Sequence, residues 1–429
     1  MIVTKILDPS SKNWFVLFYD EFQNSVLRNS HLLDTYVYSH KMTTDFAHFY
    51  LHYSGLFYGC TNDSRLVCNF PASESWNAAD HFKISLTEGL FLTYLHFRKK
   101  QSFDGDIATV VMDCVRKIYD FYVLFTMNDT MAKKYRTLYN RGQEVSETVE
   151  QVIDFRVSNP TMLKRDFWRG SQFNIFSGLD VLYFSSWLQS EYAYDRRDVF
   201  KKEVIAIMNR ACAIDSLESN AQSIVSYFIA SGNFATEEVA GLESYSDFDE
   251  NESLKEDPYL YRLLLYEYAS YVCFCESTLG VKKVLFLHNL AQKLELQEDD
   301  SQQCQIAIEN FLLNKGDKIF YLHYGEGIDL VRKAFINRCQ DFILKNKKKI
   351  VTEILESKEL VELIRKSVTE ELSEEEKQKV KEQIFDLLKT IPSLAIFMLP
   401  GAVVILPLIM KILPEEILMP SSFVNKKNH

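Results

Sequence analysis

The chain has 429 residues, 47% of them hydrophobic, and its 59 Asp and Glu outnumber its 48 Lys and Arg to give a formal net charge of −11. This length allows two or three domains with buried cores, and the low content of glycine (14) and proline (9) argues against a turn-rich sheet architecture. We do not expect a nucleic-acid partner, because phosphate binding needs clustered Lys and Arg. The only basic run is Lys345, Lys347, Lys348 and Lys349.

The first 240 residues are rich in aromatic side chains, and apolar residues recur there at three- and four-residue intervals. This period predicts an aromatic-rich helical domain over 1–240 and an all-α fold. The expected helices are 14–27, 43–58, 81–99, 107–126, 147–158 and 197–214. In the second of them the aromatic residues fall on one side, which packing between helices explains better than a cofactor or base-stacking surface.

Signals for catalysis are weak. His48 and His52 stand one helical turn apart, with His31 and His40 upstream, and two imidazoles at that spacing can share a metal. No carboxylate at a matching spacing completes the ligand set, so we predict aromatic packing there and no metal or other cofactor. No nucleotide-binding, nucleophile-elbow or zinc-protease motif occurs either, and we do not expect an enzyme.

The cysteines and the start of the sequence both indicate a cytoplasmic body. The 8 cysteines form no CxxC pair, which predicts reduced and mostly buried thiols. Asp8 and Pro9 stand where the apolar core of an export signal would lie.

An acidic stretch over 241–258 predicts an exposed linker. Asp247, Asp249 and Asn251 match the first, third and fifth positions of a calcium-binding loop, but Glu252 stands where that loop needs glycine. We therefore expect a solvated linker and no calcium site.

Residues 259–322 predict three further helices inside a helical domain over 259–344. Their order resembles the TerB-like helical domains of tellurite-resistance proteins. Those domains usually place acidic residues in the first turn between helices, and here that turn offers Glu276 before Leu279 and Gly280.

The segment 345–391 reads as two charged amphipathic helices, 350–366 and 373–390. Ser373 and Glu376 have the spacing of a capping box, which predicts where the second helix begins. Its apolar stripe has two possible partners: the body of the chain itself, or a helix of a partner protein or second copy that docks on 350–391.

The most apolar part of the chain is 394–413, in which Lys411 is the only charge. A helix of twenty residues spans roughly 30 Å, close to the hydrocarbon thickness of a bilayer. Pro400 and Pro407 would each cost about 3 kcal/mol inside a water-soluble helix, whereas transmembrane helices tolerate such breaks better. This pattern predicts a segment that associates with a lipid bilayer.

The proline spacing adds a family resemblance. Together with the apolar run, it makes 392–423 similar to the membrane segment of the LETM family, the leucine-zipper and EF-hand-containing transmembrane proteins, whose bacterial relatives carry the same segment. We take as markers of this membrane segment Pro392, Pro400, Gly401, Pro407, Lys411, Pro414, Pro420 and Phe423.

The resemblance implies a location and a role. Mitochondrial members of the family are inner-membrane proteins implicated in cation/proton exchange and in ribosome binding through a domain that follows the segment. The sequence ends at His429, shortly after Phe423, so we expect that domain to be absent. Ion transport by the segment itself is not expected, because 394–413 contains no Asp, Glu or His to bind a cation.

We therefore expect a bacterial, multi-helical soluble body in the cytoplasm, associated with the inner membrane through its C-terminus, with a non-enzymatic role in membrane or ion homeostasis or in partner tethering. The alternative is a soluble interaction or scaffold protein whose C-terminal segment is buried in its own fold or in a partner.

Overall fold

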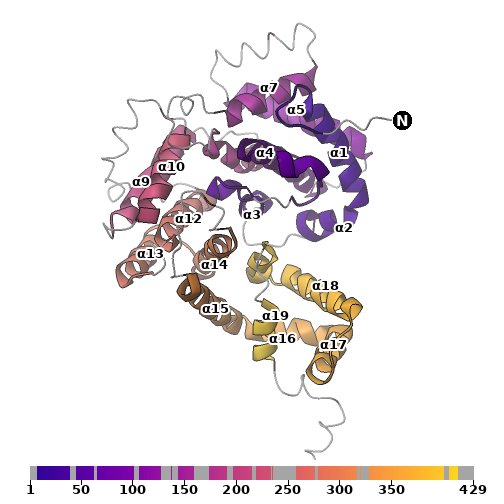
Figure 1. Ribbon diagram of the computed structural model, residues 1–429, viewed down its shortest axis with the longest axis vertical. Coiled ribbons are helices and arrows are strands. Elements are labelled where there is room, and N and C mark those ends of the chain that lie inside the picture. The colour runs from indigo at the N-terminus through magenta and orange to yellow at the C-terminus, as the bar shows by residue number, and fades with distance from the viewer. Residues whose placement is uncertain are drawn as a thin grey trace, which may run out of the picture. The chain divides into compact units, whose positions relative to one another are not determined.

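The computed structural model describes residues 7–38, 45–61, 65–100, 106–126, 137, 144–158, 173–190, 197–214, 219–232, 234, 258–275, 279–315, 319, 328–400 and 405–413. Every regular element in these ranges is a helix, and their one β contact is an isolated antiparallel bridge between Ser158 and Phe173. The predicted all-α class is therefore confirmed (Figure 1).

Contacts along the chain define two compact units. The first holds Met1–His40, Thr44–Glu256 and Lys318–Leu322. The second holds Lys41–Thr43, Asp257–Asp317 and His323–His429. Of the linker predicted over 241–258, residues 241–257 lie outside the described residues, and the five-part domain division stays a prediction.

The first unit is a set of helices arranged around α4. Its longer helices are α1 (Trp14–Arg28), α3 (Phe46–Ser54), α4 (Ala78–Lys100), α5 (Ile107–Asp120), α7 (Val145–Val157), α8 (Asp180–Ser190), α9 (Arg197–Cys212) and α10 (Ser219–Ser231). The central helix α4 contacts α3, α5, α7 and α8. Gly89 permits a close approach there, because a Cβ on it would lie 2.6 Å from the Tyr50 ring and 2.9 Å from Val181.

The expected helices of this unit differ from the observed ones mainly at their ends. The helix expected over 43–58 is α3, which stops at Gly55, a residue with a φ of 83° that an L side chain rarely adopts; the short 3-10 turn η2 (Leu56–Tyr58) follows. Position 43 lies outside the described residues. The helix expected over 107–126 is α5 followed by the π-helical segment η4 (Phe121–Thr126).

Aromatic side chains fill the core between α1 and α4, as packing between helices requires. Phe15, Phe18 and Phe22 on α1 are fully buried, and the rings of Phe18 and Phe22 lie 5.5 Å and 5.0 Å from that of Phe91 on α4. On α3, Phe46, Phe49 and Tyr50 are buried as well. These aromatic residues form a packed core.

Two buried carboxylates of the first unit are satisfied by backbone donors. Glu88 is fully buried and accepts hydrogen bonds from the amides of Val67 and Cys68, at 3.0 Å and 2.9 Å, and from the Tyr50 hydroxyl at 2.8 Å. Glu150 accepts from the amide of Phe15 in the first turn of α1, at 3.0 Å. Both carboxylates therefore hold the fold together.

The second unit begins with three helices in the order expected over 259–322. Its elements are α12 (Tyr259–Phe274), α13 (Val281–Lys293), α14 (Glu298–Lys315), α15 (Ile328–Lys345), α16 (Lys347–Glu356), α17 (Lys358–Thr369), α18 (Glu374–Thr390), η11 (Pro392–Met398) and α19 (Ile405–Ile412). Helix α12 contacts α13 and α14, and α14 contacts α15. The TerB-like resemblance stays a prediction.

The prediction of a single helix over 350–366 was wrong. The structure has two helices, α16 and α17, which meet at Ser357. The Ser357 hydroxyl accepts a hydrogen bond from the Leu360 amide at 3.3 Å and donates one to Gln383 at 2.7 Å, so the side chain begins a new helix. The capping box of α18 is confirmed, because Ser373 and Glu376 exchange both hydrogen bonds.

An ion pair between the partly exposed Arg338 and the buried Glu309 joins α14 to α15. Arg338 donates two hydrogen bonds to Glu309, at 2.7 Å and 3.1 Å, and its guanidinium lies 5.0 Å from the centre of the Phe274 ring. Burial raises the pKa of Glu309, although Arg338 opposes that shift. Arg338 therefore offsets part of the cost of burying the Glu309 carboxylate.

Replacing Arg338 with Met should destabilise the second unit by about 3 kcal/mol, because Glu309 is left buried without its partner. The measurement is hydrogen exchange of the α14 amides at increasing urea. Adding Glu309→Gln should restore most of the lost protection. The exposed Lys333 on the same helix provides the control. An equal loss of protection in Lys333→Met would contradict the stabilising role of the Arg338–Glu309 pair.

Candidate functional site

The described parts of the predicted membrane segment, 392–400 and 405–413, form short elements that pack on other helices of the second unit. In Figure 1 it forms η11 and α19 at the C-terminal end of the coloured ribbon. The 3-10 helix η11 contacts α14 and α18, and the α-helix α19 contacts α15. The candidate site is thus a packed C-terminal assembly made of α14 to α19 and η11.

Residues 393–399, which form most of η11 and the position after it, face the protein interior. The buried positions are Ser393, Leu394, Ala395, Ile396, Phe397, Met398 and Leu399. The Phe397 ring is 2% exposed and lies 6.3 Å from the ring of Phe342 on α15. The apolar surface that the sequence offers to lipid is here covered by protein.

Two buried asparagines hold the ends of η11. The Ser393 hydroxyl donates to the Asn346 side-chain oxygen at 3.0 Å, near the start of η11. The Asn310 side-chain nitrogen donates to the Pro400 carbonyl at 2.9 Å, just after its end. Each bond satisfies a polar group that packing has removed from water, which makes the position of η11 specific.

The described prolines stand where a helix does not need a backbone donor. Pro392 is the first residue of η11, and Pro400 follows the Leu399 cap. Pro407 is the third residue of α19, inside the first turn, whose amides have no intrahelical partner. Pro392 and Pro400 therefore stand at the two ends of η11, and Pro407 lies in the first described turn of α19.

Helix α19 has two faces. Leu408, Ile409 and Ile412 are buried, whereas Pro407 and Lys411, one turn apart, are exposed. Lys411 therefore stands on the exposed face of α19, while the opposite face covers α15. Of the other marker residues, Gly401, Pro414, Pro420 and Phe423 lie outside the described residues.

Within the ranges that the structure describes, no helix is both long and apolar enough to cross a membrane. Helix α19 has 8 residues, which at 1.5 Å per residue give about 12 Å of length. The helical run expected over 394–413, with breaks at its prolines, is interrupted in the described residues after Met398, where η11 ends and the backbone of Leu399 is extended.

The basic run lies at the junction of α15 and α16. Lys345 forms an ion pair with Glu298 at 2.6 Å. Lys347, Lys348 and Lys349 are exposed in the first turn of α16, where the positive end of the helix dipole opposes cations. This exposed basic turn, defined as Lys347–Lys349, is therefore a surface that an anionic partner would stabilise.

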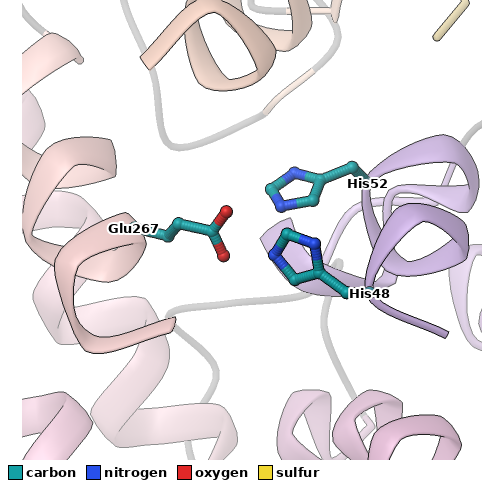
Figure 2. A group of neighbouring side chains, drawn as sticks. All are labelled: His48, His52 and Glu267. Atoms are coloured by element: carbon teal, nitrogen blue, oxygen red, sulfur yellow. The ribbon is translucent and has the colours of Figure 1, made fainter. Parts of the chain in front are cut away.

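The two histidines singled out in the sequence are neighbours on α3, as Figure 2 shows. The rings of His48 and His52 have centres 5.0 Å apart and both side chains are buried. Nδ1 of His52 lies 2.9 Å from the Tyr58 hydroxyl, and its ring stacks on Phe57 at 4.7 Å. The pair thus takes part in aromatic packing, and the expected absence of a metal stays a prediction.

Glu267, also drawn in Figure 2, belongs to α12 of the second unit and is fully buried. Within that unit, burial and then the Glu267 carboxylate raise the pKa of the Cys304 thiol. All eight cysteines are free, and only Cys60 and Cys212 are partly exposed. Burial also raises the pKa of Cys339 to about 12, and a raised pKa makes the Cys304 and Cys339 thiols weaker nucleophiles than an exposed cysteine.

Sequence reasoning identified the apolar segment but missed the residues that position it. Asn310 lies in α14 and Asn346 directly before α16, both far from η11 in the chain. The residues around them in the sequence do not indicate which group they bond. The signal that could have found them is a buried asparagine next to an apolar helix face, which must be hydrogen bonded.

The comparisons with known proteins concern this C-terminal assembly. Residues 372–429 match the family model described as LETM1-like, RBD. The matched region contains α18, η11 and α19, and it confirms the LETM-like resemblance at the C-terminus. No curated protein and no solved structure matches the chain.

Replacing Phe397 with Ala should free the C-terminal segment. Removal of a buried ring costs about 3–5 kcal/mol, and here the cost falls on the contact between η11 and α15. We expect limited proteolysis to cut 392–413 much faster in this variant. Leu355→Ala, at a side chain that is 54% exposed, is the control. Equal cutting of the variant and the original chain would contradict the packing.

Proposed function

We propose that the chain is a membrane-associated, LETM-like helical protein with a non-enzymatic role in membrane or ion homeostasis or in tethering a partner. The observation that carries this proposal is the family match over 372–429, which includes the whole proline-punctuated apolar segment. By the same resemblance, the chain is a bacterial protein whose body lies in the cytoplasm and whose C-terminus associates with the inner membrane.

The chemistry of the C-terminal assembly is compatible with contact to lipid. Leu408, Ile409 and Ile412 bury the apolar face of α19 against α15, and acyl chains could replace that protein surface at little cost because both are apolar. The basic turn Lys347–Lys349 adds attraction to anionic headgroups, worth about 1 kcal/mol per lysine near the surface.

The same residues favour association over transport. The stretch 392–413 has no Asp, Glu or His, so it offers no side chain to bind a cation or relay a proton within lipid. A role in ion homeostasis would therefore act through partner proteins. Contact with the ribosome is a further part of this proposal, and it rests on the resemblance alone.

A second function is favoured by the packing of η11. Its buried side chains and its bonds to Asn310 and Asn346 are those of a segment that belongs to the protein core. In this reading the chain is an interaction or scaffold protein that keeps its C-terminal segment in its own fold, and a partner helix or second copy docks on 350–391.

Flotation of bacterial membranes separates the two functions. We expect the full chain to float with lipid and to remain there after salt and carbonate washing, and a chain truncated before Ile391 to lose this property. Flotation is chosen because a truncated chain that aggregates sediments but does not float. A full chain found entirely in the soluble fraction would rule out the membrane role and leave the interaction protein.

The basic turn should contribute a salt-sensitive part of the binding. Lys348→Gln with Lys349→Gln should weaken binding to phosphatidylglycerol vesicles at low salt by about thirtyfold, since two headgroup attractions of about 1 kcal/mol each are lost. The measurement is vesicle co-sedimentation. Lys333→Gln with Lys358→Gln removes the same charge from exposed positions of α15 and α17. An equal loss in this control would show that only net charge matters.

A further inference from the structure

The junction of α15 and α16 carries an exposed leucine on each side of the basic turn Lys347–Lys349. Leu344, in the last turn of α15, is 45% exposed, and Leu355, in the last turn of α16, is 54% exposed. One exposed leucine is ordinary on a protein surface and needs no explanation. Two of them beside three exposed lysines form a surface that is both apolar and cationic.

Helical spacing places the exposed groups of α16 on one face. Lys348, Val351 and Leu355 follow one another at steps of three and four residues, which brings them to the same side of the helix. Leu355 lies seven residues after Lys348, about 10 Å along the helix axis. Val351 is partly exposed between them, whereas Ile350 and Ile354 are buried. The exposed face therefore leads from a cation to an apolar side chain.

The junction holds Leu344 close to this face. Leu344 stands three residues before Lys347, and three residues span at most about 11 Å. Asn346 between them is buried, and both its amide and its side-chain nitrogen donate to the Phe342 carbonyl, at 3.3 Å and 3.0 Å. The Asn346 side-chain oxygen accepts from Ser393 at 3.0 Å. The basic turn and Leu344 are thus fixed to the same part of the fold.

The chain does not neutralise the basic turn. Lys345 is paired with Glu298, but the three lysines of the turn form no ion pair with any residue that the structure describes. They repel one another, and the positive end of the α16 dipole opposes them as well. Glu353 lies two positions from Leu355 and so faces another direction, while Glu356 is exposed beside Leu355. An anionic surface would relieve the repulsion among the lysines.

We propose that this junction surface, defined as Leu344, Lys347–Lys349, Val351 and Leu355, is the site at which the chain docks on a bilayer that contains anionic phospholipid. The leucines enter the boundary between headgroups and acyl chains, and the lysines stay at the headgroup phosphates. Acyl chains accommodate separate leucines without a matching pocket, which a folded acidic partner would have to supply.

This inference rests on the membrane association proposed above and gives that association a site. The junction surface is exposed without lipid, so it can dock before α19 exchanges its protein surface for acyl chains.

Flotation of the full chain with phosphatidylglycerol vesicles tests the site. Leu344→Ser and Leu355→Ser should each weaken binding by about fivefold, and together by about 25-fold, because roughly half of each residue is available to lipid. These losses should persist at about 0.5 M salt, whereas the loss from Lys348→Gln with Lys349→Gln should shrink, because salt screens charges and leaves apolar contacts. Equal binding of the double leucine variant and the original chain would overturn the proposal.

Leu27→Ser is the matched control. Leu27 on α1 is 65% exposed, and its neighbour Arg28 is already paired with Glu21. This variant should bind as the original chain does, and a loss equal to that of Leu355→Ser would contradict the site. Melting temperatures check that all variants fold.

Two further outcomes separate this site from the function on which it rests. Vesicles of phosphatidylcholine alone should bind the full chain much more weakly, and equal binding to both kinds of vesicle would overturn the proposed preference for anionic lipid. A full chain that floats with neither kind would remove the membrane association and the site together. A full chain that floats equally well without the two leucines would remove the site alone.

Discussion

The missing backbone donor of proline determines the form of the C-terminal assembly. A helix can accept proline only where its amide has no partner, so Pro392 and Pro407 lie in first turns and Pro400 lies between elements. A long straight helix over these positions would lose hydrogen bonds at two of them. The described residues avoid that loss by forming two short elements, which then need the sides of α14, α15 and α18 to cover their apolar faces.

The sequence predicted what depends on local chemistry. Apolar periodicity located α1, α4 and α12 to α14, and the pair Ser373 and Glu376 marked the start of α18 because a capping box acts within one turn. It could not predict features that depend on distant partners. The Asn310 side chain meets Pro400 across 90 positions, and Asn174 contacts Arg156 from another element. Ser357 was missed for a different reason: the periodicity of 350–366 continues through it, and only its side-chain cap shows the break.

One solvation preference underlies both functions considered for the chain. Exposure of the apolar side chains of η11 and α19 to water is unfavourable. Either a lipid bilayer or the faces of α14 and α15 can shield these side chains from water. The family match favours lipid, and the two asparagine anchors favour protein. These observations agree if the segment is held by its own unit in water and exchanges that surface for a membrane.

The central claim is that η11 and α19 are folded on α14 and α15 when lipid is absent. Hydrogen exchange of the detergent-free full chain measures this directly, because amides in 394–399 and 405–412 report on the two elements. We expect slow exchange in both ranges without lipid, and altered exchange in 405–412 on adding anionic vesicles. Exchange at the rate of an unfolded peptide in both ranges would contradict the account.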